Sequence, residues 1–255
     1  MRRVLAALAG SAALVAASSA AAQSSTGNET SISLGAGHTS RLDRAASPVR
    51  FEGSGLELNV QRRTPLLGTD ARFAVKGGWY GLSSAASPES RENLFSAGFR
   101  LDLAEPRGSR GLRPQLGIAT DLQANVAVHR YARVSAAEKA FVFGTATIGP
   151  TAAWQRSIGG GEASLQVGLP LAGLVVRPYS AMRAGQPLSG ARWVTIGSLR
   201  APTLGASFTT SERSRFPLTF SYNLGMTRFE DPMPVRALTH SLTVKIGRRN
   251  TPTRP

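Results

Sequence analysis

Most of the chain alternates between apolar and small polar residues with a period of two. The clearest example is FPLTFSYNLGMTRF, residues 216–229. Its two sets of alternate positions differ, because one holds large apolar side chains and the other mostly small polar ones: Leu218, Phe220 and Leu224 against Thr219, Ser221 and Asn223. Successive side chains of a strand point to opposite faces, so the segment predicts one long strand with an apolar face and a polar face.

The same alternation recurs along the chain, and outside the N-terminus no stretch has a convincing helical period. Six further segments show it: 55–63, 70–81, 94–103, 115–129, 163–171 and 238–247. Glycine, proline, serine and aspartate mark the breaks between them, as turns require. Short breaks fall at 64–69, 104–111, 156–162 and 211–215, and longer ones at 42–53, 83–93, 132–139 and 173–192, with 230–235 intermediate. Short and long connections therefore alternate, which predicts an up-and-down meander with two different ends.

The kinds of side chain on the two faces indicate which solvent each face meets. The polar positions are mostly Thr, Ser, Asn, Gln and Gly, which suit a confined lumen, whereas the apolar positions suit lipid. Membrane-spanning strands must pair all their backbone groups, so the sheet has to close. We therefore predict an all-β fold, a closed up-and-down antiparallel transmembrane β-barrel of about ten strands over residues 31–248, with twelve strands as the alternative. The count treats 191–210 as one strand plus part of the preceding loop, although Pro202 weakens that assignment.

This pattern resembles the bacterial outer-membrane β-barrel superfamily over residues 31–247. The resemblance implies a location in the bacterial outer membrane and insertion by the outer-membrane assembly machinery. One feature differs from many members, because the chain ends in VKIGRRNTPTRP rather than on an aromatic residue. The usual assembly signal would then be displaced to Ile246.

The N-terminus has the three parts of a secretory signal peptide. Arg2 and Arg3 precede a short apolar run, and Ala20 and Ala22 occupy the small-residue positions of a cleavage site. We therefore expect residues 1–22 to be a signal peptide for the Sec pathway, 23–30 a short N-terminal segment and 249–255 a C-terminal tail. The 255-residue sequence contains no cysteine, which excludes disulfides, lipidation at cysteine and thiolate metal sites.

The chain is basic, with 30 Lys and Arg against 15 Asp and Glu, but no cluster, helical stripe or motif of a nucleic-acid-binding protein is present. Strand parity predicts seven lumen-facing charged residues: Glu57, Arg72, Lys76, Arg100, Asp102, Asp121 and Lys245. They would either favour anions in an open lumen or pair into a plug. Arg41, Arg177 and other arginines near strand ends are expected outside the lumen. Trp79, Trp154 and Arg228 are the predicted interfacial anchors, with lipids and lipopolysaccharide phosphates as partners.

No catalytic, metal-binding or cofactor-binding motif is recognisable, so neither catalytic residues nor a cofactor are predicted. The favoured function is non-enzymatic: a narrow porin-like pore, a ligand or solute transport barrel, or a structural surface protein. A soluble exported β-sandwich or lipocalin-like binding protein is one alternative, because alternation does not distinguish inside from outside.

The other alternative is an outer-membrane lipid hydrolase with an interfacial His/Ser site. Closure of the barrel would pair the first strand with the last, which predicts that the Cα atoms of His38 and His240 lie within about 10 Å of each other. Ser40 shares the outer face with His38, and a histidine beside a serine at a lipid interface could attack an acyl ester. No carboxylate that would orient the histidine is expected on that face.

Overall fold

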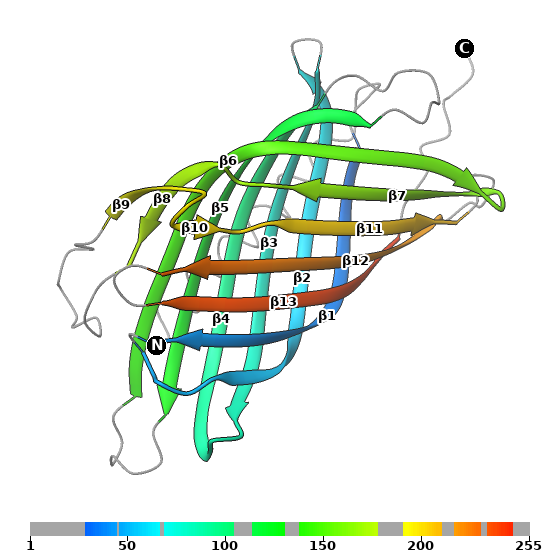
Figure 1. The fold of residues 1–255 in the computed structure, drawn as a ribbon. Coiled ribbons are helices and arrows are strands. Elements are labelled where there is room, and N and C mark those ends of the chain that lie inside the picture. Colours follow the sequence, from blue (N-terminus) through cyan, green and yellow to red (C-terminus); the bar gives the residue numbers. More distant parts are fainter. Residues whose placement is uncertain are drawn as a thin grey trace, which may run out of the picture.

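The computed structural model describes residues 29–44, 46–66, 69–104, 114–130, 138–177, 191–210, 217–230 and 234–246. Within these ranges, thirteen strands form a single antiparallel sheet (Figure 1). The predicted signal peptide and C-terminal tail lie outside the described residues. No described helix is long and apolar enough to cross a membrane.

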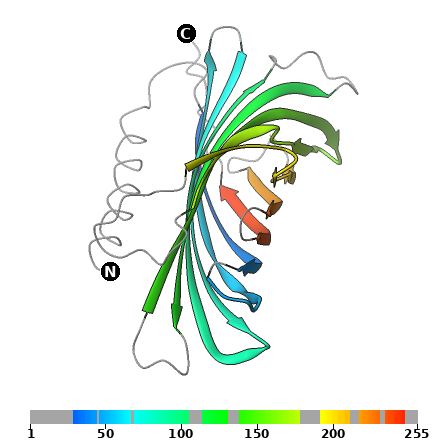
Figure 2. The ribbon, with the colours of Figure 1, turned by 60° about the vertical axis from the view of Figure 1, so that its left-hand side comes forward.

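The sheet closes on itself through ten strands. Six long strands form one part of the wall: β1 (Glu29–Asp43), β2 (Phe51–Leu66), β3 (Thr69–Ser84), β4 (Ser87–Ala104), β5 (Gln115–Arg130) and β6 (Glu138–Ile158). The wall continues through β7 (Gly161–Gly168), β11 (Thr203–Thr209), β12 (Leu218–Phe229) and β13 (Val235–Ile246), and β13 pairs with β1. Figure 2 shows the blue, cyan and green strands curving round toward the orange and red ones. The predicted ten-stranded closed meander is confirmed.

Three shorter strands extend the ladder beyond this path: β8 (Ala172–Val176), β9 (Ala191–Thr195) and β10 (Leu199–Arg200). β8 continues β7 along β6, and β9 pairs with β8. β10 and β11 both pair with β12, so 199–209 behaves as one interrupted strand, whereas the part before it, 191–195, is paired with β8 rather than being loop. The interruption coincides with Pro202, which has no amide hydrogen to donate but accepts a hydrogen bond from the Met226 amide at 3.2 Å.

Two predicted loops are partly strand. The stretch 83–93 is almost entirely a hairpin, because β3 runs to Ser84 and β4 begins at Ser87. The stretch 173–192 begins and ends in the paired strands β8 and β9. Polar and charged residues suggested loops at both places, but strands that extend beyond a membrane face water on their outer side and tolerate such residues. The barrel also begins at Glu29, slightly before its predicted start at Ser31.

The two rims of the barrel differ. The short-turn rim carries the β2–β3 and β6–β7 turns and both described ends, Glu29 and Ile246. The β6–β7 turn is tight because Gly159 and Gly160 adopt positive φ angles of 58° and 84°, which glycine accepts without strain. The long-loop rim lies at the opposite strand ends, where β1, β5, β8 and β12 finish. Large apolar residues are exposed around the outer wall between the rims.

Candidate functional site

The lumen contains two adjoining cavities, and the first also reaches along β12 and β13 toward the long-loop rim, where Thr227 and Ala237 line it. The first has a volume of about 320 Å³ and lies at mid-barrel, and the second has about 260 Å³ and is lined by residues next to the rim, such as Ser31 and Lys245. Asn59, Gln166 and Asn223 line both. The polar faces of the strands thus surround one continuous polar space.

Charged side chains of the lumen are arranged in pairs. Glu57, at the first cavity, is buried, and its Oε2 lies 3.0 Å from Lys76 Nζ. Tyr80 donates a hydrogen bond to the other oxygen of the same carboxylate. Gly55 makes room for this arrangement, because a Cβ there would lie only 2.7 Å from the Tyr80 ring. The small residue therefore lets the ring lie flat against the wall with its hydroxyl on Glu57.

A second group of lumen charges surrounds Arg100. Its guanidinium donates to both carboxylate oxygens of Asp102, at 2.9 and 3.2 Å, and lies 3.9 Å from Asp121. Gln166, which projects from β7, donates a hydrogen bond of 3.4 Å to Asp102. These contacts brace β4 against β5 and β7.

A third group lies next to the short-turn rim. Arg63 holds Asp70 through two hydrogen bonds of 2.6 and 2.5 Å, and Arg72 contacts the same carboxylate at 3.4 Å. Arg72 and Lys245 line the smaller cavity. Six of the seven charged residues that parity assigned to the lumen line one of the two cavities, and the seventh, Asp102, contacts Arg100 and Gln166.

The end of the lumen at the long-loop rim contains tightly packed side chains. Two buried apolar clusters occupy it, one formed by Phe51, Tyr80, Leu82, Leu94 and Ala127, the other by Phe143, Val175, Val194, Leu199, Phe229 and Val235. Both consist of inward-pointing residues of strand ends. Because tightly packed apolar side chains leave no path for hydrated ions, these clusters narrow the lumen at this end.

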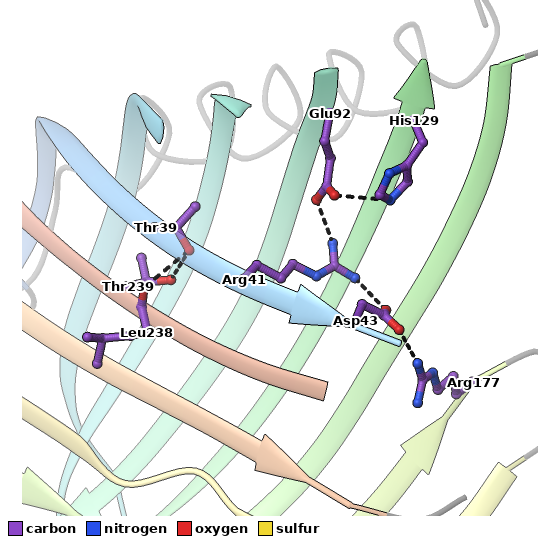
Figure 3. A network of polar contacts seen from close by, with 8 residues as sticks. All are labelled: Thr39, Arg41, Asp43, Glu92, His129, Arg177, Leu238 and Thr239. Atoms are coloured by element: carbon purple, nitrogen blue, oxygen red, sulfur yellow. Dashed lines mark hydrogen bonds and ion pairs between the residues drawn. The ribbon is translucent and has the colours of Figure 1, made fainter. Parts of the chain in front are cut away.

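A buried chain of charges, which we call the rim network, completes the filling (Figure 3). Arg41 is only 4% exposed, and its guanidinium lies 3.1 Å from Glu92 and 2.9 Å from Asp43. Asp43 also pairs with Arg177, which follows β8. The rim network thus joins strands that lie apart in the wall, namely β1, β4 and the end of β8.

His129 of β5 forms the other end of the rim network. Its Nε2 lies 3.0 Å from Glu92 Oε2, and its ring packs edge-on between Phe51 and Phe141, with centroid separations of 5.1 and 5.2 Å. Phe51 also belongs to the first apolar cluster, so the charged and apolar parts of the filling are continuous.

The rim network corrects the expectation that Arg41 and Arg177 lie outside the lumen. Both are buried within it, at 4% exposure each. Strand parity indicates the inward direction of Arg41. Arg41 shares a face of its strand with Gly37 and Thr39, whereas the apolar Leu34 and Ala36 lie on the outward face. Glu92 and His129 were not predicted, because their contact requires the register of the β4–β5 ladder, and the contact of Glu92 with Arg41 requires the curvature that brings β1 within reach of β4.

The predicted interfacial anchors are on the outer wall. Trp79 is 48% exposed, toward the long-loop rim, whereas Trp154 is 37% exposed, toward the short-turn rim. Arg228 is exposed near the end of β12 and pairs with Glu230, which follows the strand. Hydrogen bonding from Arg228 holds the pKa of Glu230 below its usual range. Trp193 is the most exposed large apolar residue on the wall, at 81%, and was not singled out from the sequence.

The prediction that His38 and His240 meet at barrel closure is confirmed, because they are direct partners in the β1–β13 ladder, with ring centroids 5.5 Å apart. A carboxylate does lie on this outer face, but it contacts a serine rather than the histidine. Glu52 of β2 lies opposite Ser40 and accepts a hydrogen bond from it at 3.1 Å. Within the described ranges, no group of three or more histidine, aspartate or glutamate residues is placed to hold a metal ion.

No protein-family model matches the sequence, and no curated protein matches it. Among solved structures, the translocator domain of the autotransporter NalP from Neisseria meningitidis is similar over 95% of each chain, with 11% identity and a TM-score of 0.52. The outer membrane protease OmpT from Escherichia coli has 8% identity over 88% of this chain and 98% of its own, with a TM-score of 0.47. Of these two similarities, the one to the NalP translocator domain is high enough to identify the fold.

The fold is that of the bacterial outer-membrane β-barrels. The resemblance inferred from the alternating pattern is thereby confirmed at the level of the fold. Identities this low carry no information about activity, so the function has to be argued from the side chains of this chain.

Proposed function

We propose that this chain is an integral protein of the bacterial outer membrane, whose lumen is non-enzymatic and closed at rest, and that it serves as a structural surface protein. The observation that carries the proposal is the contrast between the two ends of the lumen. The end at the long-loop rim holds the two apolar clusters and the rim network, whereas the polar cavities extend from below them to the short-turn rim.

The outer wall supports the membrane location. Exposed leucine, isoleucine, valine and phenylalanine residues project from strands all around the barrel, for example Leu34, Ile118, Leu165 and Leu242, each at least 42% exposed. In water, such a continuous band would be an aggregation hazard, whereas in a bilayer it is the lipid-facing surface. Trp79 and Trp154 lie toward its two edges, where an aromatic belt would contact lipid headgroups.

The pairing of charges argues against an anion-selective pore. A selective channel needs charged groups that interact with the passing ion, yet Glu57, Arg100 and Asp102 are already held in contacts with neighbouring side chains. Paired charges instead brace opposite walls of a narrow barrel. By the usual arrangement of such barrels, the short-turn rim would face the periplasm and the filled, long-loop rim would face outward.

Lipids and lipopolysaccharide phosphates are the proposed partners at the outer edge of the band. Arg228 and Arg236 project from the outer wall near the long-loop rim, each about half exposed, and both share Glu230. Long arginine side chains can lie along the apolar wall and reach phosphates at the surface. The outer-membrane assembly machinery is the expected partner during insertion.

Two measurements test the proposal. The folded barrel should migrate faster on an unheated gel than after boiling, and it should leave the membrane fraction only with detergent. Liposomes that contain it should swell in isotonic arabinose no faster than empty liposomes. Recovery as a soluble periplasmic monomer would contradict the membrane location, and rapid swelling would contradict the closed lumen.

A further inference from the structure

A polar patch on the outer wall joins the first and last parts of the barrel, where β1 lies between β13 and β2. His38, Ser40, Glu52 and Ser54 all project outward there, and His240 flanks His38 on the other side. The exposed residues of the wall between the rims are mostly large and apolar, so a group of histidine, serine and glutamate side chains stands out there. We refer to these five residues as the seam patch.

The hydrogen-bond register fixes the level of the seam patch on the wall. The outward row next to it toward the short-turn rim is entirely apolar or aromatic: Tyr222, Leu242, Ala36, Leu56, Trp79 and Phe95. The following row contains His240, His38 and Ser54, and the one after it Leu238, Ser40 and Glu52. On β1 and β2 the seam patch therefore begins where the apolar row ends, whereas Met226 and Leu238 continue the apolar surface beside it on β12 and β13.

In a bilayer, that boundary is where hydrocarbon meets headgroups, and it is the level of the ester carbonyls of membrane lipids. Leu56 and Leu242 lie directly beside the seam patch on the apolar side and are 58% and 65% exposed. An acyl chain could lie along them while its ester group reaches His38 and Ser54.

The contacts within the seam patch distinguish the roles of its two serines. Ser54 Oγ lies 3.3 Å from His38 Nδ1, within the range expected of a nucleophile and its base in an enzyme without substrate. Ser40 instead donates to Glu52 at 3.1 Å. His38 is positioned from both sides, because its ring contacts Ser54 on β2 and lies 5.5 Å from the ring of His240 on β13.

We propose that the seam patch is an ester-hydrolase site for acylated lipids of the outer leaflet, with Ser54 as nucleophile and His38 as general base. This inference rests on the proposed membrane location but not on the closed lumen. It adds an activity on the outer wall to a barrel whose interior is non-enzymatic.

The reaction balances with water as the second reactant. Ser54 Oγ attacks the acyl carbonyl carbon while His38 Nδ1 takes the hydroxyl proton, and that proton then passes to the oxygen of the departing alcohol. Water attacks the acyl–serine ester and loses its proton to Nδ1, which returns it to Ser54 Oγ as the fatty acid leaves.

The first experiment uses the folded full-length barrel in detergent micelles, purified from a host that lacks outer-membrane phospholipase. An alkyl fluorophosphonate should label Ser54, identified by peptide mass spectrometry, and p-nitrophenyl decanoate should be hydrolysed. Ser54→Ala should abolish both readouts. His38→Gln should lower both by about 100-fold or more, the usual effect of removing a general base.

Ser83→Ala is the matched control, because Ser83 also projects from the outer wall but makes no contact with His38 in this structure; labelling and hydrolysis should be unchanged. Heat-modifiable migration establishes that every variant is folded. A folded wild type that neither reacts with the probe nor hydrolyses the ester would overturn the proposal. So would labelling that persists in Ser54→Ala or is confined to Ser40.

The second experiment distinguishes the two sources of acyl ester. Phospholipid vesicles and purified lipopolysaccharide are incubated separately with the wild type, and the released fatty acids are identified by mass spectrometry. Ester-linked 3-hydroxy fatty acid would indicate lipopolysaccharide, whereas a plain fatty acid would indicate phospholipid. Release of neither would overturn the assignment of outer-leaflet lipid as the substrate.

Discussion

Tyr80 donates its phenolic hydrogen to the Glu57 carboxylate from the neighbouring strand, inside the barrel at the boundary between its packed end and its polar cavity. The ring of Tyr80 belongs to an apolar cluster, while its hydroxyl reaches the ion pair of Glu57 with Lys76. This single side chain therefore links the packing of one half of the lumen to the electrostatics of the other.

The Tyr80–Glu57 pair should show a coupling free energy in a double-mutant cycle. Tyr80→Phe leaves a buried carboxylate short of one donor, and a hydrogen bond to a charged group contributes about 1.5–3 kcal/mol. Glu57→Gln should have a smaller effect, since Lys76 is partly exposed and water can solvate it. The readout is the unfolding temperature, measured as the temperature at which the fast-migrating folded barrel becomes the slow-migrating unfolded chain on a gel. If the losses of stability of the two single variants simply add in the double variant, the two side chains are not coupled and the prediction is wrong.

Gly55→Ala should destabilise the barrel strongly. A Cβ at this position would lie 2.0 Å from the Trp79 carbonyl oxygen and 2.7 Å from the Tyr80 ring, so both the strand spacing and the ring would have to shift. Overpacking of this kind costs about 1–3 kcal/mol. The shift in gel migration should occur at a lower temperature than in the wild type.

Gly77→Ala is the control for the glycine prediction, because Gly77 lies on the neighbouring strand β3 and a Cβ there would meet nothing within 4 Å. Its unfolding temperature should stay close to that of the wild type. Equal losses from both substitutions would indicate a general intolerance of alanine in these strands rather than a close contact at Gly55.

Glu230 should give a small pH-dependent contribution to stability. Because a hydrogen bond from Arg228 lowers the pKa of the folded state, folding favours the ionised carboxylate. The contribution is present above the ordinary glutamate pKa of 4.5 and is lost as pH falls through the lower folded value. Wild type and Glu230→Gln should differ slightly in unfolding temperature at pH 7 and converge in acid. A difference that grew below pH 4.5 would contradict this sign.

Alternation was sufficient to predict the architecture, because a barrel wall has the same two-faced pattern in every strand. Residues 218–229 show why: each outward apolar side chain is followed by a small inward one, and closure requires nothing further from the sequence. The ends of the strands were harder to predict. Around Ser83 and Asn93 the outer face carries polar residues, and the period of two no longer distinguishes strand from loop.

The contents of the lumen could be predicted only in part. Parity gave the direction of Glu57, Lys76, Arg100 and Asp102, but pairs such as Arg41 with Glu92 depend on which strands lie within reach across the barrel. One contact in the seam patch could be predicted from the sequence, and another could not. Closure predicted that His38 meets His240, whereas the placement of Glu52 opposite Ser40 required the exact register of the β1–β2 hairpin.

The closed lumen is tested most directly by single-channel recording in planar bilayers. The wild-type barrel should insert without stable conductance steps, because apolar clusters and the rim network narrow the lumen at the long-loop rim. The double variant Arg41→Ala, Phe229→Ala, which removes a central charge of the network and the bulk of one cluster, should show discrete openings. Steady, well-defined conductance of the wild type would contradict the account.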